Sequence, residues 1–345
     1  MAFQTRVVRL ATTTSLALLL GGLVACGGGT TTPTDGAATD AASTSDASGS
    51  AEPGLEGSVL IDGSSTVFPI SEAMAEEFNK ANPGVEVTVN LSGSGGGFKK
   101  FCAGETDISN ASRPIKESEV ELCNENGIEF IEVPVAYDGL TIVVNPENEW
   151  AQCMTVEQLN AMWSPEAEEG GVDNWSEVDP SFPDQPLALY GPGADSGTFD
   201  YFTEVVNDDG GASRGDYQAS EDDNLIVTGV QAEPGAMGYF GYAYFEENSG
   251  ALKAVEIQNE AGDCVGPAPE TIADGSYNPM SRPLFYYVAL SAYESRPEVK
   301  AFADFMIDPT NSAFIGDVGY IPLPDADISA SQTRLNDKVT GKSSS

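Results

Sequence analysis

The stretch VLIDGSSTVFPI, residues 59–70, predicts a strand, a loop of small polar residues and a helix in direct succession. Residues 59–61 are apolar, as in a buried strand, and a glycine- and hydroxyl-rich loop follows them. Pro69 suits the first turn of a helix, and apolar residues then repeat at helical spacing as far as residue 81. Units of this order build α/β folds.

The same unit occurs twice more along the chain. Alternating valines at residues 85–89 predict a strand that runs into Ser-Gly-Ser-Gly-Gly-Gly at 92–97, and a helix follows. Residues 187–190 predict a third strand, which leads into Gly-Ala-Asp-Ser-Gly-Thr at 193–198 and another helix. We call residues 63–69, 92–97 and 193–198 the first, second and third loops. Each follows the carboxyl end of a strand, the edge where open α/β sheets bind ligands.

These three loops together predict a binding site for a small oxyanion. A helix N-terminus exposes unpaired N–H groups and carries roughly half a positive charge, so it holds an anion without a cation. Hydroxyl groups add donors that rotate to suit a tetrahedral ligand. The hydroxyls in the loops include those of Ser65, Thr66, Ser94, Ser196 and Thr198. A single glycine-rich loop is more often a tight turn, so the prediction depends on all three loops meeting at one point.

Two arginines are candidate contacts for the anion, because the chain has only 15 Lys and Arg residues. A guanidinium binds an oxyanion with two parallel hydrogen bonds, which an ammonium does not do. Arg113 follows a predicted strand end near the loops, where it contacts the ligand or forms a structural ion pair. Arg214 is the second candidate. We expect Arg282, which precedes a proline, to be structural.

The whole pattern predicts an α/β fold of two lobes, with mixed sheets flanked by helices and a ligand cleft between the lobes. Roughly 280 residues of globular sequence exceed what one core usually serves. A strand at 284–290 and a helix at 298–307 are expected to return to the first lobe. Lobe I is then residues 58–140 plus 280–337, and lobe II is residues 141–279.

Two crossings between such lobes allow them to close over a ligand. Asp138 lies at the first crossing, where its carboxylate either accepts a hydrogen bond from a protonated anion or caps the hinge. Other expected elements are strands at 107–112, 129–133 and 140–144 and helices at 116–124 and 155–163.

The N-terminal segment predicts export and lipid anchoring. Residues 1–25 carry two arginines before a short apolar run, which is typical of a cleaved signal peptide. Cys26 follows Leu-Val-Ala, an order that resembles the bacterial lipoprotein signal and implies lipidation of Cys26; the alternative is an ordinary signal with an incidental cysteine. Residues 26–57, rich in Gly, Thr, Ala, Ser and Asp, predict a disordered linker. We expect a protein anchored on the periplasmic side or outer face of the cytoplasmic membrane.

Composition narrows the function further. The formal net charge of −39 argues against nucleic acid as a partner, which requires basic surfaces. The chain has no His, so a Ser-His-Asp mechanism and the usual zinc sites are excluded, and we predict no catalysis, metal or cofactor. The four cysteines other than Cys26 allow three pairings. We favour Cys102–Cys123 and Cys153–Cys264, because each pair then falls within one predicted lobe.

Four segments together resemble the substrate-binding lipoproteins of phosphate ABC importers. They lie at residues 63–69, 93–99, 107–114 and 195–199. The resemblance implies a type II periplasmic-binding-protein fold that captures inorganic phosphate for an integral-membrane ABC permease; we expect a monomer. The resemblance implies ligand-binding residues in the three loops, and we include two of their loop neighbours. The full set is Ser65, Thr66, Val67 through its amide, Ser94, Gly95, Ser196, Gly197 and Thr198.

Two positions depart from this resemblance. Well-known members have an Asp where this chain has Ser112, and that Asp accepts the proton of hydrogen phosphate. They also have an Arg where this chain has Pro192. The guanidinium is therefore expected from Arg113 or Arg214, and the acceptor from Asp138 or from no residue.

Two other functions stay open. The first is binding of another oxyanion, such as sulfate or molybdate, because selection of phosphate over sulfate depends on a carboxylate acceptor. The second is a surface scaffold or adhesion protein on the same fold, which needs no small ligand. A phosphate-monoester hydrolase is a more remote alternative.

Overall fold

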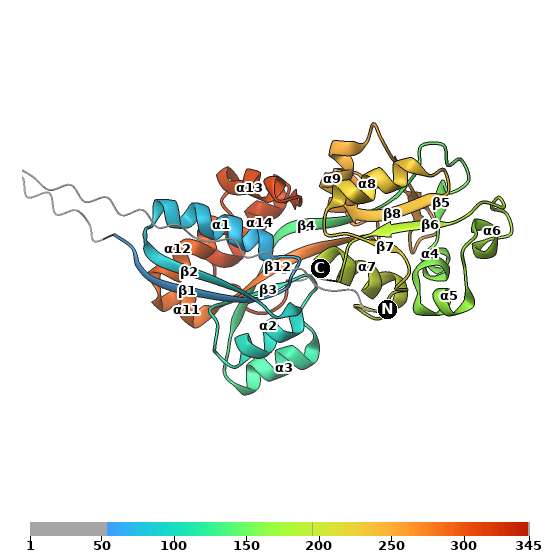
Figure 1. Ribbon diagram of the computed structural model, residues 1–345. Coiled ribbons are helices and arrows are strands. Elements are labelled where there is room, and N and C mark those ends of the chain that lie inside the picture. The colour runs from blue at the N-terminus through green and yellow to red at the C-terminus, as the bar shows by residue number, and fades with distance from the viewer. Residues whose placement is uncertain (1–53, 195, 344–345) are drawn as a thin grey trace, which may run out of the picture. The chain divides into compact units, whose positions relative to one another are not determined.

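The computed structural model describes residues 54–194 and 196–343 (Figure 1). The predicted signal peptide, Cys26 and most of the predicted linker lie outside the described residues. Among the described residues the strands of the larger sheet are β1 (Glu56–Gly63), β2 (Gly84–Leu91), β3 (Ile108–Ala111), β4 (Phe130–Val144), β6 (Ala188–Gly191), β7 (Gln218–Ala219), β8 (Ala236–Gly241), β9 (Lys253–Ala254), β12 (Ser281–Ala289) and β13 (Ile321–Pro322). Their order is β2-β1-β3-β12-β4-β8-β6-β7, and β9 and β13 both pair with β4 outside this path. A smaller sheet, in the order β11-β10-β5, consists of β5 (Cys153–Met154), β10 (Glu256–Gln258) and β11 (Cys264–Val265).

Helices flank the larger sheet, as Figure 1 shows. They are α1 (Phe68–Ala81), α2 (Gly93–Cys102), α3 (Glu117–Glu125), α4 (Val156–Trp163), α5 (Pro165–Gly170), α6 (Trp175–Val178), α7 (Gly197–Asn207), α8 (Asp223–Ala232), α9 (Tyr242–Asn248), α10 (Pro269–Ala273), α11 (Leu290–Ser295), α12 (Pro297–Met306), α13 (Ser312–Asp317) and α14 (Asp325–Asn336), with one 3-10 turn, η1 (Pro309–Asn311). In the part of the chain that the structure describes, no helix combines the length and the apolar character needed to cross a membrane.

The three predicted strand–loop–helix units are present, as β1–α1, β2–α2 and β6–α7. One boundary differs from the prediction, because α2 already begins at Gly93 and most of the second loop is its first turn. Glycine has a low helix propensity, so the glycines at 93 and 95–97 predicted a loop where the helix begins. Close packing explains the glycines: a Cβ atom on Gly97 would lie 2.5 Å from the Cα atom of Gly63. The helix can therefore start directly against the end of β1.

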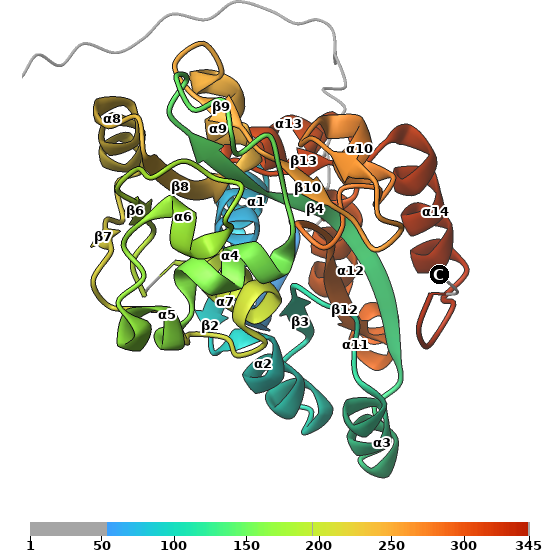
Figure 2. The ribbon, with the colours of Figure 1, turned by 90° about the vertical axis from the view of Figure 1, so that its right-hand side faces the viewer.

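Strand β4 runs through both parts of the larger sheet. Its first part pairs antiparallel with β12, and residues 140–144 pair antiparallel with β8; Figure 2 shows β4 running from the side of α3 to the side of α8. The prediction of separate strands at 129–133 and 140–144 is wrong. Pro134 lies within β4, the register with β12 shifts between Leu284 and Phe285 beside it, and the pairing continues. Proline has no N–H to donate to the neighbouring strand, and such an irregularity lets the pairing continue past it.

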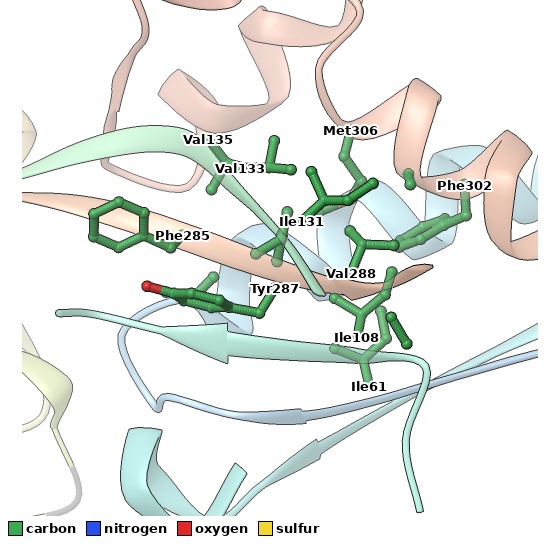
Figure 3. Close-up of a cluster of buried hydrophobic side chains, with 14 of the residues drawn as sticks. Ile61, Ile108, Ile131, Val133, Val135, Phe285, Tyr287, Val288, Phe302 and Met306 are labelled. Carbon is green, nitrogen blue, oxygen red and sulfur yellow. The ribbon is translucent and has the colours of Figure 1, made fainter. Parts of the chain in front are cut away.

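Buried apolar side chains form two large clusters. One draws on residues 59–136 and 284–335, and the other on residues 140–280. Figure 3 shows part of the first cluster, including Ile61, Ile108, Val288, Phe302 and Met306. The predicted α/β fold of two lobes is therefore confirmed, while the residue boundaries given for the lobes stay a prediction. Strand β1 begins at Glu56, inside the range assigned to the linker, because its backbone pairs with Gly84 of β2 whatever its side chains are.

Both predicted disulfides are present in the structure, Cys102–Cys123 and Cys153–Cys264. The first joins the end of α2 to α3, and the second lies in the small sheet, between β5 and β11. Each therefore ties together segments on one side of the β4 crossing, which was the reason for predicting this pairing.

Candidate functional site

The first loop connects the end of β1 to α1 with several backbone donors left free. The Ser64 amide donates to the carbonyl oxygen of Asn110 at 3.0 Å, and the Thr66 amide donates to Ser64 Oγ at 3.2 Å. Among the described residues, the amides of Ser65 and Val67 have no acceptor. Val67 is the N-cap of α1 and makes no capping bond through its side chain. These N–H groups are available to a ligand, as expected at a helix N-terminus.

The second loop lies directly beside the first. The Ser92 amide donates to the carbonyl oxygen of Gly63 at 3.1 Å. The Ser94 hydroxyl accepts from the amide of Ser112 at 3.1 Å and lies 3.2 Å from the Ser112 hydroxyl. Ser112 follows β3, so three consecutive strands of the sheet bring their polar ends together.

The third loop meets the first loop from the other side. The Thr66 hydroxyl donates to the carbonyl oxygen of Gly197 at 3.5 Å, and Ser196 caps α7 by accepting from the Thr198 amide at 3.2 Å. The backbones are so close that a Cβ atom on Gly197 would lie 2.9 Å from the Thr66 nitrogen. Among the described residues, the second and third loops therefore each contact the first loop.

A pocket of about 410 Å³, here called the loop pocket, opens at this meeting point. Most of its wall comes from the first and second loops, Ser112 and α7. The lining residues are Ser64, Ser65, Thr66, Gly93, Ser94, Gly95, Ser112, Arg113, Asp200, Glu204, Asp208, Asp209, Gly210 and Arg282. Of the predicted ligand-binding residues, Ser65, Thr66, Ser94, Gly95, Ser112 and Arg113 line this pocket.

A second pocket of about 400 Å³ includes two further predicted residues, Asp138 and Thr198. Asp138 is buried and pairs with Arg282, Oδ2 to Nε, at 3.2 Å. Burial raises the pKa of Asp138, and the charge of Arg282 opposes that rise. Asp138 therefore contacts the loop pocket only through its arginine partner.

Arg113 lines the loop pocket but is held by a carboxylate. Its two terminal nitrogens donate to the two carboxylate oxygens of Glu119 at 2.9 and 2.8 Å. These hydrogen bonds raise the pKa of Arg113. The structural ion pair that the sequence left open is thus present.

Arg214 was predicted as a possible ligand contact. It does not line the loop pocket. Its guanidinium is buried, pairs with Asp216, and donates to the carbonyl oxygens of Met162 and Val172 at 2.8 and 3.0 Å. These contacts tie the 212–216 segment to α4 and to the chain after α5, so the side chain is structural.

Arg282, expected to be structural, lines the loop pocket. Its Nη2 donates to the Thr66 hydroxyl at 2.9 Å, and its guanidinium carbon lies 3.5 Å from the ring centre of Tyr201. The sequence signal was the placement of a rare basic residue at a predicted crossing, where strand β12 begins.

Four acidic residues of the pocket wall were also missed: Asp200, Glu204, Asp208 and Asp209. Asp200 Oδ2 accepts from the Ser65 hydroxyl at 3.5 Å, and desolvation raises the pKa of Asp200. No group of three or more His, Cys, Asp or Glu in the described residues is arranged to hold a metal ion. The acids therefore give the pocket mouth negative charge without a metal-ligand geometry.

The chain is similar to known proteins over most of its length. Residues 33–310 match the PBP superfamily domain. The chain is 47% identical over 268 residues to Protein SphX of Synechocystis sp., covering 78% of this chain and 79% of that protein. It is 39% identical over 291 residues to phosphate-binding protein PstS of Staphylococcus saprophyticus, covering 84% of this chain and 87% of that protein.

The chain also aligns with the crystal structure of a possible phosphate binding protein from Planctomyces limnophilus. The TM-score is 0.78 at 48% identity, covering 83% of this chain and 99% of that chain. This chain belongs to the PstS-like family of phosphate-binding proteins. PstS-like proteins are extracytoplasmic substrate-binding proteins of transport systems, not a family of enzymes.

This PstS-like chain is uncharged at both positions where the sequence departs from its family. Ser112 lines the loop pocket with a hydroxyl. The carbonyl oxygen of Pro192 accepts a hydrogen bond from the Tyr217 hydroxyl at 2.7 Å, so its role is local. Any guanidinium at the site must come from another segment of the chain.

Proposed function

We propose that this chain is an extracytoplasmic solute-binding protein that captures inorganic phosphate and delivers it to an ABC-type permease. The observation that carries the proposal is a pocket lined by hydroxyl groups of the first and second loops, each at the start of a helix. The third loop, at the start of α7, contacts the first loop at Thr66, although Ser196, Gly197 and Thr198 do not line this pocket. Relatives named phosphate-binding protein, aligned over most of their length, support the choice of phosphate as ligand.

The donors that we assign to the ligand are the free amides of Ser65 and Val67 and the hydroxyls of Ser94, Ser112 and Thr66. The Thr66 hydroxyl would turn to the ligand from the carbonyl oxygen of Gly197, 3.5 Å away. Neutral donors bind an anion well when they are fixed beforehand and water is excluded. In this proposal the protein binds the ligand without changing it chemically, so it has no catalytic role.

A protonated phosphate also needs an acceptor for its O–H group. We assign this role to Asp200, because it lines the loop pocket beside Ser65, whereas Asp138 pairs with Arg282. Sulfate has no proton to donate at neutral pH, so the carboxylate repels it. Competition of sulfate against phosphate in the wild type and in Asp200→Asn tests this point: the variant should lose most of the preference. An unchanged preference would remove Asp200 from the proposal.

Isothermal titration of inorganic phosphate into ligand-stripped protein tests the function itself. We expect saturable binding with a Kd of about 1 μM or lower, which corresponds to about −8 kcal/mol. Thr66→Ala/Ser94→Ala should weaken binding strongly, since both hydroxyls line the pocket. Thr228→Ala, on the exposed side of α8, is the matched control and should bind as the wild type does. Absence of binding at millimolar phosphate would contradict the proposal and favour another oxyanion or a scaffold role.

We further infer that the protein is a monomer anchored to the membrane by lipid on Cys26. Metabolic labelling with a radioactive fatty acid should mark the wild type and leave Cys26→Ser unlabelled. Light scattering of the protein without its first 26 residues should give the mass of one chain. A labelled Cys26→Ser would rule out this anchor.

A further inference from the structure

Arg282 has hydrogen-bonding capacity that the protein itself does not use. A guanidinium carries five N–H donors. Within the described residues, Nε donates to Asp138 and one Nη2 hydrogen donates to Thr66, so three donors have no protein acceptor. The side chain is only 11% exposed and lines the loop pocket. These three N–H groups are therefore available to an acceptor in the pocket that Arg282 lines.

The geometry of the Asp138 ion pair leaves the useful edge of the guanidinium open. The carboxylate bonds through Nε, at the inner side of the group, at 3.2 Å. The two terminal nitrogens, which bind oxyanions in parallel pairs, are left for Thr66 and the pocket. Arg113 differs in this respect, since Glu119 occupies both of its terminal nitrogens.

The Arg282 side chain is also fixed in advance. Its guanidinium carbon lies 3.5 Å from the ring centre of Tyr201, a stacking contact that guanidinium groups favour. Tyr201 is itself held, because its hydroxyl donates to the carbonyl oxygen of Pro279 at 2.7 Å. A side chain held on one face and one edge loses little further freedom on binding a ligand.

We propose that Arg282 supplies the guanidinium of the anion site, with its Nη edge bonded to a phosphate oxygen beside Thr66. The inference rests on the proposed function and goes beyond it by naming the positive charge. Arg282 contacts Asp138 of β4, Thr66 of the first loop and Tyr201 of α7. An anion on this arginine is therefore linked to Tyr201 of the second core cluster and to Thr66, the neighbour of Val67 in the first core cluster.

Titration of inorganic phosphate into matched variants tests the inference. We expect Arg282→Gln to weaken binding about 100-fold, as the loss of a charge-assisted pair of hydrogen bonds predicts. Arg282→Lys should recover only part of this loss, because an ammonium lacks the parallel donors. Arg113→Gln, the same change on the same pocket wall, should weaken binding less than about fivefold, since Glu119 already occupies that group.

Removing Arg282 alone leaves the buried Asp138 carboxylate unpaired, which threatens folding. Arg282→Gln/Asp138→Asn removes both charges at nearly constant volume and guards against that problem. We expect it to melt near the wild-type temperature and to bind phosphate as weakly as Arg282→Gln. Near wild-type affinity in a folded double variant would overturn the inference, and so would an equal loss in Arg113→Gln. Failure of the wild type to bind phosphate would instead overturn the proposed function, and this inference with it.

Discussion

Gly197 of the third loop lies against Thr66 of the first loop so closely that a Cβ atom on Gly197 would be 2.8 Å from Thr66 Oγ1. That Cβ atom would also be 2.9 Å from the backbone nitrogen of Thr66. The backbone cannot move aside as a flexible side chain can. The contact joins segments next to different core clusters, because α7 packs in one cluster and α1 in the other. Glycine is therefore required at 197 by the close approach of two backbones.

Gly197→Ala is expected to weaken phosphate binding. Forcing an extra methyl group into a packed contact typically costs about 1–3 kcal/mol, which is roughly a 5- to 150-fold change in Kd. Titration calorimetry measures the change, and thermal melting shows whether the fold survives. Gly250→Ala is the matched control, since a Cβ atom there would meet nothing within 4 Å. Wild-type affinity in Gly197→Ala would show that this contact is not part of the binding-competent state.

Asp223, the first residue of α8, gives the protein a pH-dependent stability. Desolvation, followed by the charges of Asp222 and Glu221, raises the pKa of Asp223 to about 6. A raised folded-state pKa contributes stability that is complete below the unfolded value near 3.8 and is lost as pH rises through about 6. Asp223 therefore destabilises the ionised protein at neutral pH.

Asp223→Asn should raise the melting temperature at pH 7.5 and leave it unchanged at pH 4. The destabilisation implied by the raised pKa of Asp223 is reduced by solvent screening and by the dipole of α8, which favours a negative charge at its N-terminus. We expect a gain of about 1 kcal/mol, or roughly 1–3 °C for a domain of this size. Melting curves at pH 4, 6 and 7.5 measure it. An equal difference at all three pH values would show that the cause is not titration.

Negative charge at the loop pocket should slow the arrival of phosphate at low salt. Asp200, Glu204, Asp208 and Asp209 line the pocket, and its two arginines each pair with a carboxylate. The Debye length shrinks from about 30 Å at 0.01 M salt to about 10 Å at 0.1 M. Raising NaCl from about 10 to 100 mM should therefore accelerate association several-fold, as stopped-flow tryptophan fluorescence would measure.

The variant Asp208→Asn/Asp209→Asn isolates this effect. It should associate faster at low salt and depend less on salt than the wild type. Asp208 has a φ of 55°, which asparagine tolerates well, so the backbone should be undisturbed. Glu125→Gln/Glu129→Gln removes the same charge from an exposed segment and should behave as the wild type. Association that slows with salt would show that attraction by the arginines dominates.

The convergence of the loops was predictable because each loop follows a strand and starts a helix. The parallel pairing of β1 with β2 and with β3 then places the polar ends of these strands at one edge. The start of α2 was not predictable, since its glycines serve packing against Gly63 and not helix propensity. The continuity of β4 was missed because it depends on tertiary pairing, with β12 along its first part and with β8 along residues 140–144.

The charged residues of the site could not be assigned from sequence alone. Arg282 reaches Thr66 across 216 positions in the chain, and no local pattern marks such a contact. Arg214 was a plausible candidate because arginines are rare here, but its partners Met162 and Val172 are more than 40 residues away. The location of hydroxyl and amide donors is set by the position of the backbone, which the sequence pattern predicts. The direction of a long charged side chain depends instead on tertiary packing.

The Cys102–Cys123 disulfide should matter for ligand binding as well as for stability. It links the end of α2, whose first turn is the second loop, to α3, which carries Glu119, the partner of Arg113. Cys102→Ser/Cys123→Ser should cost about 3 kcal/mol of stability, from the chain entropy of the loop that it closes. It should also weaken phosphate binding several-fold, because both walls of the pocket become more mobile.

Cys153→Ser/Cys264→Ser provides the matched comparison. This bridge spans 111 residues, so chain entropy predicts a larger loss of stability, about 5 kcal/mol. It lies in the small sheet, and neither cysteine lines the loop pocket. Phosphate affinity in the folded variant should therefore stay near the wild-type value. Denaturant unfolding and titration calorimetry on both double variants measure the two quantities. If both variants lost affinity in proportion to lost stability, the first disulfide would have no specific role in holding the second loop.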